Sequence, residues 1–463
     1  MHRIINLSVT ALARAIRNRE ISSTEVVDAY LNRIKEVNPE LNAVVQLSEK
    51  SAREQAVQAD NALLRGEVSG PLHGIPITVK DSFDAAGLIS TGGTGGRSNF
   101  VPSRDATVVS RLRSAGAIVL GKTNTSELTL TYETDNLIYG RTNNPYDLSR
   151  SPGGSSGGAA AIVAAGGSAF DIGSDYGGSL RFPAHCCGVA TIKPTSGCVP
   201  RTGHIFPFGG VLDSFQQVGP MARSVDDLAM ILPIIAGPDH IDPGIVPVTL
   251  KDPNEVVLKG LRVAFHSDNG IASPSPETGR AVREAAARLA DEGLIVTEIR
   301  PNGIEQTYEL MIGLLSADGG TSIRRLLEDA GTTEHTLPWL GLSEPVDAVR
   351  FDALIMKWFE FRSTLLSFFK DYDVILSPVN ASPALPHGSL GADLEAFSYT
   401  MTYNMTGWPA AVVRGGTSPE GLPIGVQIVA RPWREDVALA VAGYLEKKLG
   451  GFQPPPIESK PDQ

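Results

Sequence analysis

The chain has 463 residues, of which 42% are hydrophobic and 20% charged, proportions that suit a globular protein with a large core. Its formal charge of −11 argues against a nucleic-acid backbone or an anionic membrane surface as a partner. The cysteines have neither the number nor the spacing of a disulfide framework or a zinc site, and the N-terminus lacks the apolar core of a signal peptide. We therefore expect a cytoplasmic location, no bound metal and three reduced thiols: Cys186, Cys187 and Cys198.

The N-terminal part of the chain changes from helical to strand-like patterns. Helical periodicity dominates residues 1–65, where Ser22 and Glu25 have the spacing of a capping box. The sequence GIPITVKD then predicts a short apolar strand that ends at Lys80. Residues 105–124 (DATVVSRLRSAGAIVLGKTN) predict a helix, a glycine turn and a buried strand.

Glycine and serine become frequent between residues 151 and 200, where turns separate small-residue pieces. Residues 260–299 predict a strand, a helix and a strand that form a βαβ unit, after which residues 302–346 are mostly helical. DYDVILSPV, residues 371–379, predicts another buried strand, and the Pro-rich tail 451–463 is expected to fray. Because no linker separates independent units, we predict one α/β domain with helices on both faces of its sheet.

The segment GGSSGG, residues 153–158, matches the nucleophile-elbow pattern G-x-S-x-G twice. Asp373 and His387 could complete an α/β-hydrolase triad, but a polar turn rather than a strand precedes the glycines. The S-x-x-K and S-D-N patterns of β-lactamases occur at residues 367–370 and 267–269, which is the wrong chain order. No P-loop pattern is present. These schemes therefore do not explain the paired serines.

A lysine could serve as the base that activates a serine. Lys80 ends an apolar run, and burial that lowered its pKa by roughly 3 units, equivalent to about 4 kcal/mol, would leave much of the amine neutral near pH 7. The other interpretation is a surface ion pair between Lys80 and the adjacent Asp81. Composition alone leaves both interpretations open.

Four longer segments, taken together, resemble the amidase signature family of serine hydrolases: GIPITVKD, SPGGSSGGAAAIVAAGG, DIGSDYGGSLRFPAHCCGVATIKPT and VGPMARSVDDLA. Lys80, Ser155 and Ser179 stand 75 and 24 residues apart, as in the family's Ser–cis-Ser–Lys triad. GKTNTSEL and NMTGWPAAVV extend the resemblance over nearly the whole chain. It implies the amidase signature fold, a large, mixed, twisted β-sheet covered by helices on both faces.

The resemblance also implies a single amidase domain over residues 1–463. Its expected parts are N-terminal helices (1–65), a catalytic core with the Lys and Ser motifs (66–235), a variable substrate-side region (236–345), the C-terminal part of the core (346–450) and the tail (451–463).

By resemblance, Ser179 is the nucleophile, Ser155 relays its proton and neutral Lys80 is the final base, with an acyl-enzyme as intermediate. The family's cis peptide bond would join Gly154 to Ser155, and Ser156 would hold the network by hydrogen bonds. Backbone N–H groups of four consecutive residues would form the oxyanion hole: Tyr176, Gly177, Gly178 and Ser179. A pair of charged side chains would brace this turn: Asp175 and Arg181.

The activity implied is an amidohydrolase that cleaves the C–N bond of a small aryl or alkyl amide, a carbamate (urethane) or, as an easier reaction, an ester. The expected pocket residues suit an uncharged acyl or aryl group: Thr129, Leu130, Thr131, Tyr132, His204, Ile205, Phe206 and Phe208. His185 and His204 lack the spacing of a metal site and are interpreted as packing or pocket-lining residues. No cofactor is implied, and a homodimer stays open.

Two other functions stay open. The family includes the glutaminase subunit of the tRNA-dependent amidotransferases, which works in a multi-subunit complex. That subunit usually carries Thr where this chain has Tyr176 and Gln where it has Phe182, and both departures disfavour glutamine as the substrate. A binding protein on an inactive amidase scaffold is disfavoured because all three triad positions are present.

Overall fold

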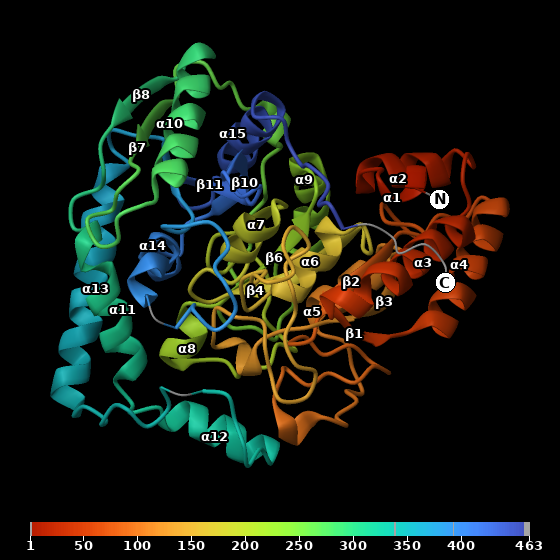
Figure 1. The fold of residues 1–463 in the computed structure, drawn as a ribbon, viewed down its shortest axis with the longest axis horizontal. Helices are drawn as coiled ribbons and strands as arrows, with labels where there is room; N and C mark the ends of the chain where they lie inside the picture. Colours follow the sequence, from red (N-terminus) through yellow and green to blue (C-terminus); the bar gives the residue numbers. More distant parts are fainter. Residues whose placement is uncertain (1, 338, 392, 458–463) are drawn as a thin grey trace.

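One mixed β-sheet runs through the computed structural model, which describes residues 2–337, 339–391 and 393–457 (Figure 1). The eleven strands of these residues have the order β1-β3-β2-β4-β6-β5-β10-β11-β9-β7-β8. They are β1 (Val44–Leu47), β2 (Pro76–Lys80), β3 (Ile118–Thr123), β4 (Phe170–Asp175), β5 (Ala190–Lys193), β6 (Gln217–Ala222), β7 (Arg262–Phe265), β8 (Ile295–Glu298), β9 (Val374–Pro378), β10 (Ala410–Thr417) and β11 (Pro423–Ala430).

Helices surround this sheet (Figure 1). The α-helices are α1 (His2–Ile5), α2 (Val9–Arg17), α3 (Ser23–Leu41), α4 (Glu49–Leu64), α5 (Thr107–Ser114), α6 (Gly157–Ala164), α7 (Arg181–Cys187), α8 (Gly210–Ser214), α9 (Val225–Ile235), α10 (Pro276–Asp291), α11 (Thr307–Ser316), α12 (Thr321–Ala330), α13 (Ala348–Phe368), α14 (Ser398–Thr406) and α15 (Glu435–Lys448). Single 3₁₀ turns are η1 (Gly95–Arg97), η2 (Glu127–Thr129), η3 (Pro253–Glu255), η4 (Ile304–Gln306) and η5 (Leu394–Phe397).

The central strands are buried between two layers of helices. Helices α6 and α7 pack on each other; α6 packs on β1, β2, β3, β4 and β6, and α7 packs on β5, β10 and β11. Helices α9, α10 and α15 contact strands of the same sheet from the other side. The small residues of α6 are all buried, so the glycine- and alanine-rich run after GGSSGG serves close packing on the sheet. The predicted α/β fold, with helices on both faces of a large mixed sheet, is confirmed.

The sheet brings the lysine motif and the second serine motif to one edge. Strands β2 and β4 are parallel neighbours, with Thr78 opposite Asp171 and Val79 opposite Ile172. Their carboxyl ends therefore lie side by side, which is where open α/β sheets place their functional groups. Lys80 ends β2, and the turn after β4 holds Ser179.

Most predicted elements are present: the capping box of Ser22 and Glu25, strand β2, the α5–β3 unit, the parallel β7–α10–β8 unit and strand β9. Two predictions were incomplete. Strand β1 interrupts the helices of residues 1–65, and within residues 302–346 α-helices cover only 307–316 and 321–330. The tail has no helix or strand up to residue 457, and residues 458–463 lie outside the described part.

Candidate active site

The side chain of Lys80 is fully buried and is held by three serine hydroxyls. Its Nζ lies 2.7 Å from Ser155 Oγ, 2.9 Å from Ser156 Oγ and 3.0 Å from Ser174 Oγ. The structure therefore brings together the lysine and both serines of GGSSGG. Ser174, on β4, is a third partner that the sequence interpretation missed, although it stands only one residue before the predicted Asp175.

Burial lowers the pKa of Lys80 to about 7, against an ordinary value near 10.5, because the charged ammonium loses its hydration. The carboxylates of Asp175 and Asp171 act in the opposite direction and keep the pKa from falling further. A substantial fraction of the amine is consequently neutral at neutral pH. Lys80 thus has the protonation behaviour that a general base needs.

Asp171 is a second buried group beside this lysine. Burial raises the pKa of its carboxyl to about 7, and hydrogen bonds from Thr78 and Thr123 oppose that rise. Lys80 and Asp171 therefore both change charge close to pH 7. A pH profile of this site reports the titration of the two groups together.

The proposed surface ion pair between Lys80 and Asp81 is wrong. Asp81 is also buried, and its carboxylate lies 3.5 Å from Nζ of Lys122 on the neighbouring strand β3 and accepts from Thr91. Successive side chains of a strand point to opposite faces of the sheet. The side chains of Lys80 and Asp81 therefore point away from each other, although the two residues are adjacent in the sequence. The amine of Lys80 therefore contacts the serine hydroxyls and not the carboxylate of Asp81.

The GGSSGG turn precedes α6 and contains a cis peptide bond between Gly154 and Ser155. A side chain at Gly154 would meet the backbone of Tyr132 at 2.6 Å, so only glycine fits there. Thr134 fastens the turn, since its Oγ1 donates to the carbonyl of Gly153 at 2.9 Å and accepts from the N–H of Gly157 at 3.0 Å. This threonine was not among the predicted site residues.

The turn after β4 carries Ser179, whose carbonyl accepts from the N–H of Ser156 at 3.2 Å. The N–H of Gly178 donates to Asp175 Oδ1 at 2.8 Å, so it is occupied within the protein. Within the described residues, the N–H groups of Gly177 and Ser179 are free of protein acceptors, and the oxyanion role of residues 176–179 stays a prediction.

Asp175 and Arg181 form a fully buried, two-point ion pair, with Nε–Oδ2 and Nη2–Oδ1 distances of 2.9 Å. Burial alone would raise the pKa of Asp175, but the Arg181 guanidinium lowers it well below its usual range. The Arg181 side chain also donates to the carbonyl of Thr400 and to Asn404. The pair links the Ser179 turn to α14.

We expect Arg181→Met to destabilise the fold by about 3–5 kcal/mol, because it leaves a buried carboxylate without its counter-charge. Urea unfolding at pH 7 measures this loss. In the matched control Arg65→Met, the exposed ion pair with Glu67 is removed, and the expected change is below about 1 kcal/mol. Equal unfolding midpoints for Arg181→Met and wild type would show that the pair does not hold the turn.

Aromatic side chains from distant segments gather beside the Ser179 turn. Tyr132 stacks on Phe397 with ring centroids 3.5 Å apart, and its hydroxyl donates to the carbonyl of Gly177 at 3.1 Å. On another side, Tyr176 contacts the ring of Phe206 at 6.0 Å. Of the predicted pocket residues, Tyr132 and Phe206 therefore contact residues of the Ser179 turn.

Four of the other predicted pocket residues have different surroundings. Thr129 is buried and Leu130 packs on the hydrophobic core. Thr131 donates to the carbonyl of Glu133, and Phe208 is 39% exposed with the guanidinium of Arg201 over its ring. Leu130 also packs against the cluster that contains Phe206. The pocket role of these four residues stays a prediction.

The residues considered for an α/β-hydrolase triad have partners outside the Lys80 site. Asp373 pairs with Arg262 and Arg431, and His387 pairs with Glu133. The cysteines are buried, and burial raises the pKa of the Cys187 thiol. Among the described residues, no group of three or more His, Cys, Asp or Glu side chains could hold a metal ion, and no helix has the length and apolarity needed to cross a membrane.

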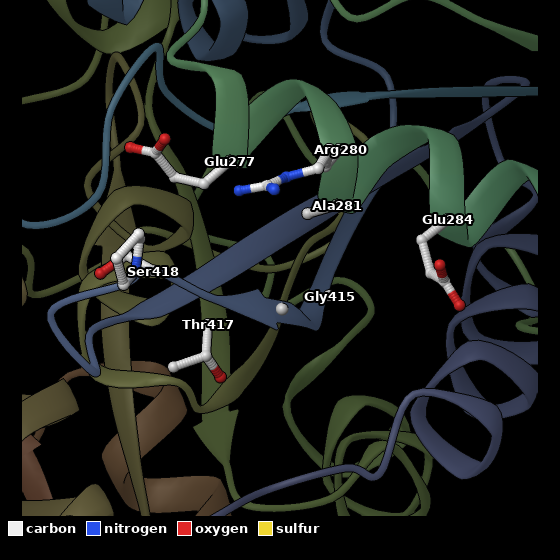
Figure 2. Close-up of a pocket in the computed structure, with 9 residues that line it drawn as sticks. Glu277, Arg280, Ala281, Glu284, Gly415, Thr417 and Ser418 are labelled. Atoms are coloured by element: carbon white, nitrogen blue, oxygen red, sulfur yellow. The ribbon is translucent and has the colours of Figure 1, made fainter.

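A surface groove of about 450 Å³ lies between α10 and the loop that joins β10 to β11 (Figure 2). Figure 2 shows Glu277, Arg280 and Glu284 extending from the helix, with Thr417 and Ser418 on the opposite side. None of the predicted site residues lines it. The groove is therefore separate from the Lys80 site.

The site thus consists of a buried lysine that contacts three serine hydroxyls at the strand ends of a mixed α/β sheet. The chain belongs to the amidase signature family: the family model described as Amidase matches residues 25–439. The chain is thus a carbon–nitrogen hydrolase of this family.

Individual relatives differ in their substrates. The chain is 34% identical to human fatty-acid amide hydrolase 2, covering 97% of this chain and 90% of that protein. It is also 34% identical to a glutamyl-tRNA(Gln) amidotransferase subunit from Alkaliphilus metalliredigens, covering 98% and 99%. The solved structure of 6-aminohexanoate cyclic dimer hydrolase superposes with a TM-score of 0.88 at 30% identity, covering 98% and 99%. Overall similarity therefore does not select a substrate.

Proposed function

We propose that this protein hydrolyses the C–N bond of small, uncharged amides or carbamates through Ser179, Ser155 and Lys80. The observation that carries the proposal is the buried Lys80 amine, which has a pKa of about 7 and lies 2.7 Å from Ser155 Oγ. A base of this pKa in direct contact with a hydroxyl can take its proton at neutral pH.

In the proposed reaction, Ser179 Oγ attacks the carbonyl carbon while its proton passes to Ser155 and the proton of Ser155 passes to Lys80. Backbone N–H groups of the Ser179 turn stabilise the negative oxygen. Ser155 then protonates the leaving amine and is reprotonated by Lys80, which gives the acyl-enzyme. Water, deprotonated through the same relay, releases the acid and restores Ser179.

The relay needs a contact between the hydroxyls of Ser155 and Ser179. The N–H of Ser156 donates to the carbonyl of Ser179, and this hydrogen bond holds the two turns side by side. Hydrogen bonds of catalytic groups commonly close only when substrate is bound. Rotation of the Ser179 side chain is the motion that the proposal requires.

The aromatic surroundings support an uncharged acyl or aryl group. Tyr132, Phe182 and Phe397 contact one another on one side of the turn, and Tyr176 and Phe206 contact on the other. Such a surface favours apolar groups over the polar side chain of glutamine. Esters should react more readily than amides, because an alkoxide leaves without being protonated first.

Glutamine hydrolysis in an amidotransferase complex is the second candidate function, favoured by the similarity to the Alkaliphilus amidotransferase subunit. Against it, Phe182 packs edge-on against Phe397 with centroids 4.8 Å apart, where glutaminase subunits usually have a glutamine. This position therefore holds a buried apolar ring rather than a hydrogen-bonding amide.

A panel of substrates distinguishes the two candidate functions, hydrolysis of small amides or carbamates and hydrolysis of glutamine. We expect kcat/KM for an aryl acyl anilide, an aryl carbamate and an aryl ester to exceed that for glutamine by about 10²-fold or more, the discrimination that one or two mismatched polar groups produce. Release of p-nitroaniline or p-nitrophenol and of ammonia measures the rates. Preferential hydrolysis of glutamine would instead establish the second function.

A further inference from the structure

The hydroxyl of Tyr176 is buried near the proposed nucleophile and has no hydrogen-bond partner among the described residues. Tyr176 follows the last residue of β4 and begins the Ser179 turn, and the residue is 8% exposed. Buried tyrosine hydroxyls usually have a partner, because an unpartnered polar group loses its hydration without compensation. The Tyr176 hydroxyl is therefore an exception, and a bound ligand would supply the missing partner.

The other aromatic side of the Ser179 turn differs in this respect. The Tyr132 hydroxyl donates to the carbonyl of Gly177 at 3.1 Å, so it is already bonded within the protein. Phe182 and Phe397, which contact the Tyr132 ring, have no polar side-chain atoms. These three rings therefore present apolar surface, and the hydroxyl among them is occupied.

The ring of Tyr176 lies at the boundary between two hydrophobic clusters. It packs in the main core, where its centroid is 6.1 Å from that of Phe215. Phe206, with a centroid 6.0 Å away, belongs to a second cluster that includes Leu128 and side chains of α12. Thr129, which follows Leu128 in the chain, has another buried hydroxyl without a partner among the described residues. This side of the turn therefore combines apolar rings with unbonded hydroxyls.

The Tyr176 hydroxyl keeps its proton at neutral pH. Burial raises the pKa of Tyr176 well above its ordinary value, and the nearby Tyr132 and Asp318 act in the same direction. The carboxylate of Asp318 is itself occupied, because it accepts from the N–H groups of Gly320 and Ser322 at 2.8 Å. A neutral phenol has one proton to donate, so the partner that it lacks is an acceptor.

We propose that Tyr176 is a specificity-determining residue whose hydroxyl donates to an acceptor oxygen of the substrate; this rests on the function proposed above. The substrate is then an uncharged amide or carbamate with an ether or carbonyl oxygen on one side of the scissile bond and an apolar group on the other. The apolar group packs against Tyr132 and Phe397, and the oxygen lies on the side of Tyr176 and Phe206. Substrate binding supplies the acceptor that the hydroxyl lacks in the free protein.

The test uses pairs of substrates that differ only by an oxygen in place of a methylene group. One pair consists of p-nitroanilides with a methoxyacetyl or a butyryl acyl group, and the other of butyramides of 4-methoxyaniline or 4-ethylaniline. We expect Tyr176→Phe to lower the ratio of kcat/KM, oxygen over methylene, about three- to tenfold in one of the pairs, the effect of one neutral hydrogen bond. Comparison with wild type cancels the intrinsic reactivities of the substrates.

Urea unfolding distinguishes recognition of the substrate from packing. Tyr176→Phe removes no recorded hydrogen bond of the free protein, so its unfolding midpoint should equal or exceed that of wild type. The control is Tyr30→Phe, which alters a fully buried tyrosine whose hydroxyl accepts from Arg223 at 3.4 Å. This control should lower the midpoint and keep the wild-type substrate ratios.

The substrate ratio decides the outcome, because a purely structural loss would affect both members of a pair equally. An unchanged or increased ratio for both pairs in Tyr176→Phe would show that the hydroxyl does not bind the substrate, and would overturn the proposal. Inactivity of the wild type, or activity of Ser179→Ala, would instead refute the proposed function.

Discussion

Replacing Ser179 with Ala should abolish hydrolysis of every substrate that the wild type turns over, with a loss in kcat of about 10⁵-fold or more, as for nucleophiles of other serine hydrolases. The reason is that no acyl-enzyme can form without its oxygen. The fold should persist, because Ser179 contributes only its carbonyl to the recorded hydrogen bonds of the described residues. Single-turnover assays and labelling by a fluorophosphonate measure the effect.

The matched control is Ser149→Ala, which removes an exposed hydroxyl whose hydrogen bond goes to the Asp147 carboxylate. This variant should keep wild-type turnover and label normally. If the fluorophosphonate labelled Ser179→Ala at the wild-type rate, the nucleophile would be another serine. Ser155 would then be the first candidate to examine.

Replacing Lys80 with Met should lower kcat/KM by about 10³–10⁴-fold, near the upper end of what a general base contributes. In the wild type, the folded pKa of Lys80 is lowered to about 7, so the reactive neutral amine is the minor form below pH 7 and the major form above it. The wild-type profile should therefore rise about tenfold per pH unit below pH 7 and level off above it. Lys80→Met should lose this rise.

A second substitution, Lys80→Arg, distinguishes the role of Lys80 as a base from its role as a positive charge. A guanidinium keeps a positive charge and hydrogen-bond donors but is not deprotonated in proteins. We expect it to be as inactive as Lys80→Met. Substantial activity of Lys80→Arg, in a variant whose urea midpoint matches wild type, would show that a positive charge rather than a base is needed.

Sequence reasoning predicted the parts of the site that are encoded locally. The apolar run of β2 made a buried Lys80 one of the two interpretations that the pattern left open, and the glycine-rich segments predicted turns around Ser155 and Ser179. These signals lie within a few residues of each position, as turn glycines and strand patterns do. The spacing of the three motifs then linked them through the resemblance to one family.

The contacts that the sequence could not predict join residues far apart in the chain. Ser174 contacts Lys80, 94 positions away, and His204, 30 positions away, because β2 and β4 are neighbours and the loop after β5 returns to the end of β2. Likewise, Asp81 pairs with Lys122 because β3 lies beside β2. Strand order and register decide these contacts, and neither is encoded in the local pattern.

The most direct test of this mechanism is the titration of the Lys80 amine itself, followed by NMR of lysine labelled with ¹³C at Cε. Lys193 and Lys122 are also buried, and burial lowers the pKa of Lys193 to about 7 and that of Lys122 below its ordinary value. Single arginine substitutions of Lys80, Lys122 and Lys193 therefore assign the three signals. The expected result is a Lys80 signal with a midpoint of about 7. A Lys80 signal that stays protonated up to about pH 10, like an ordinary lysine, would contradict it.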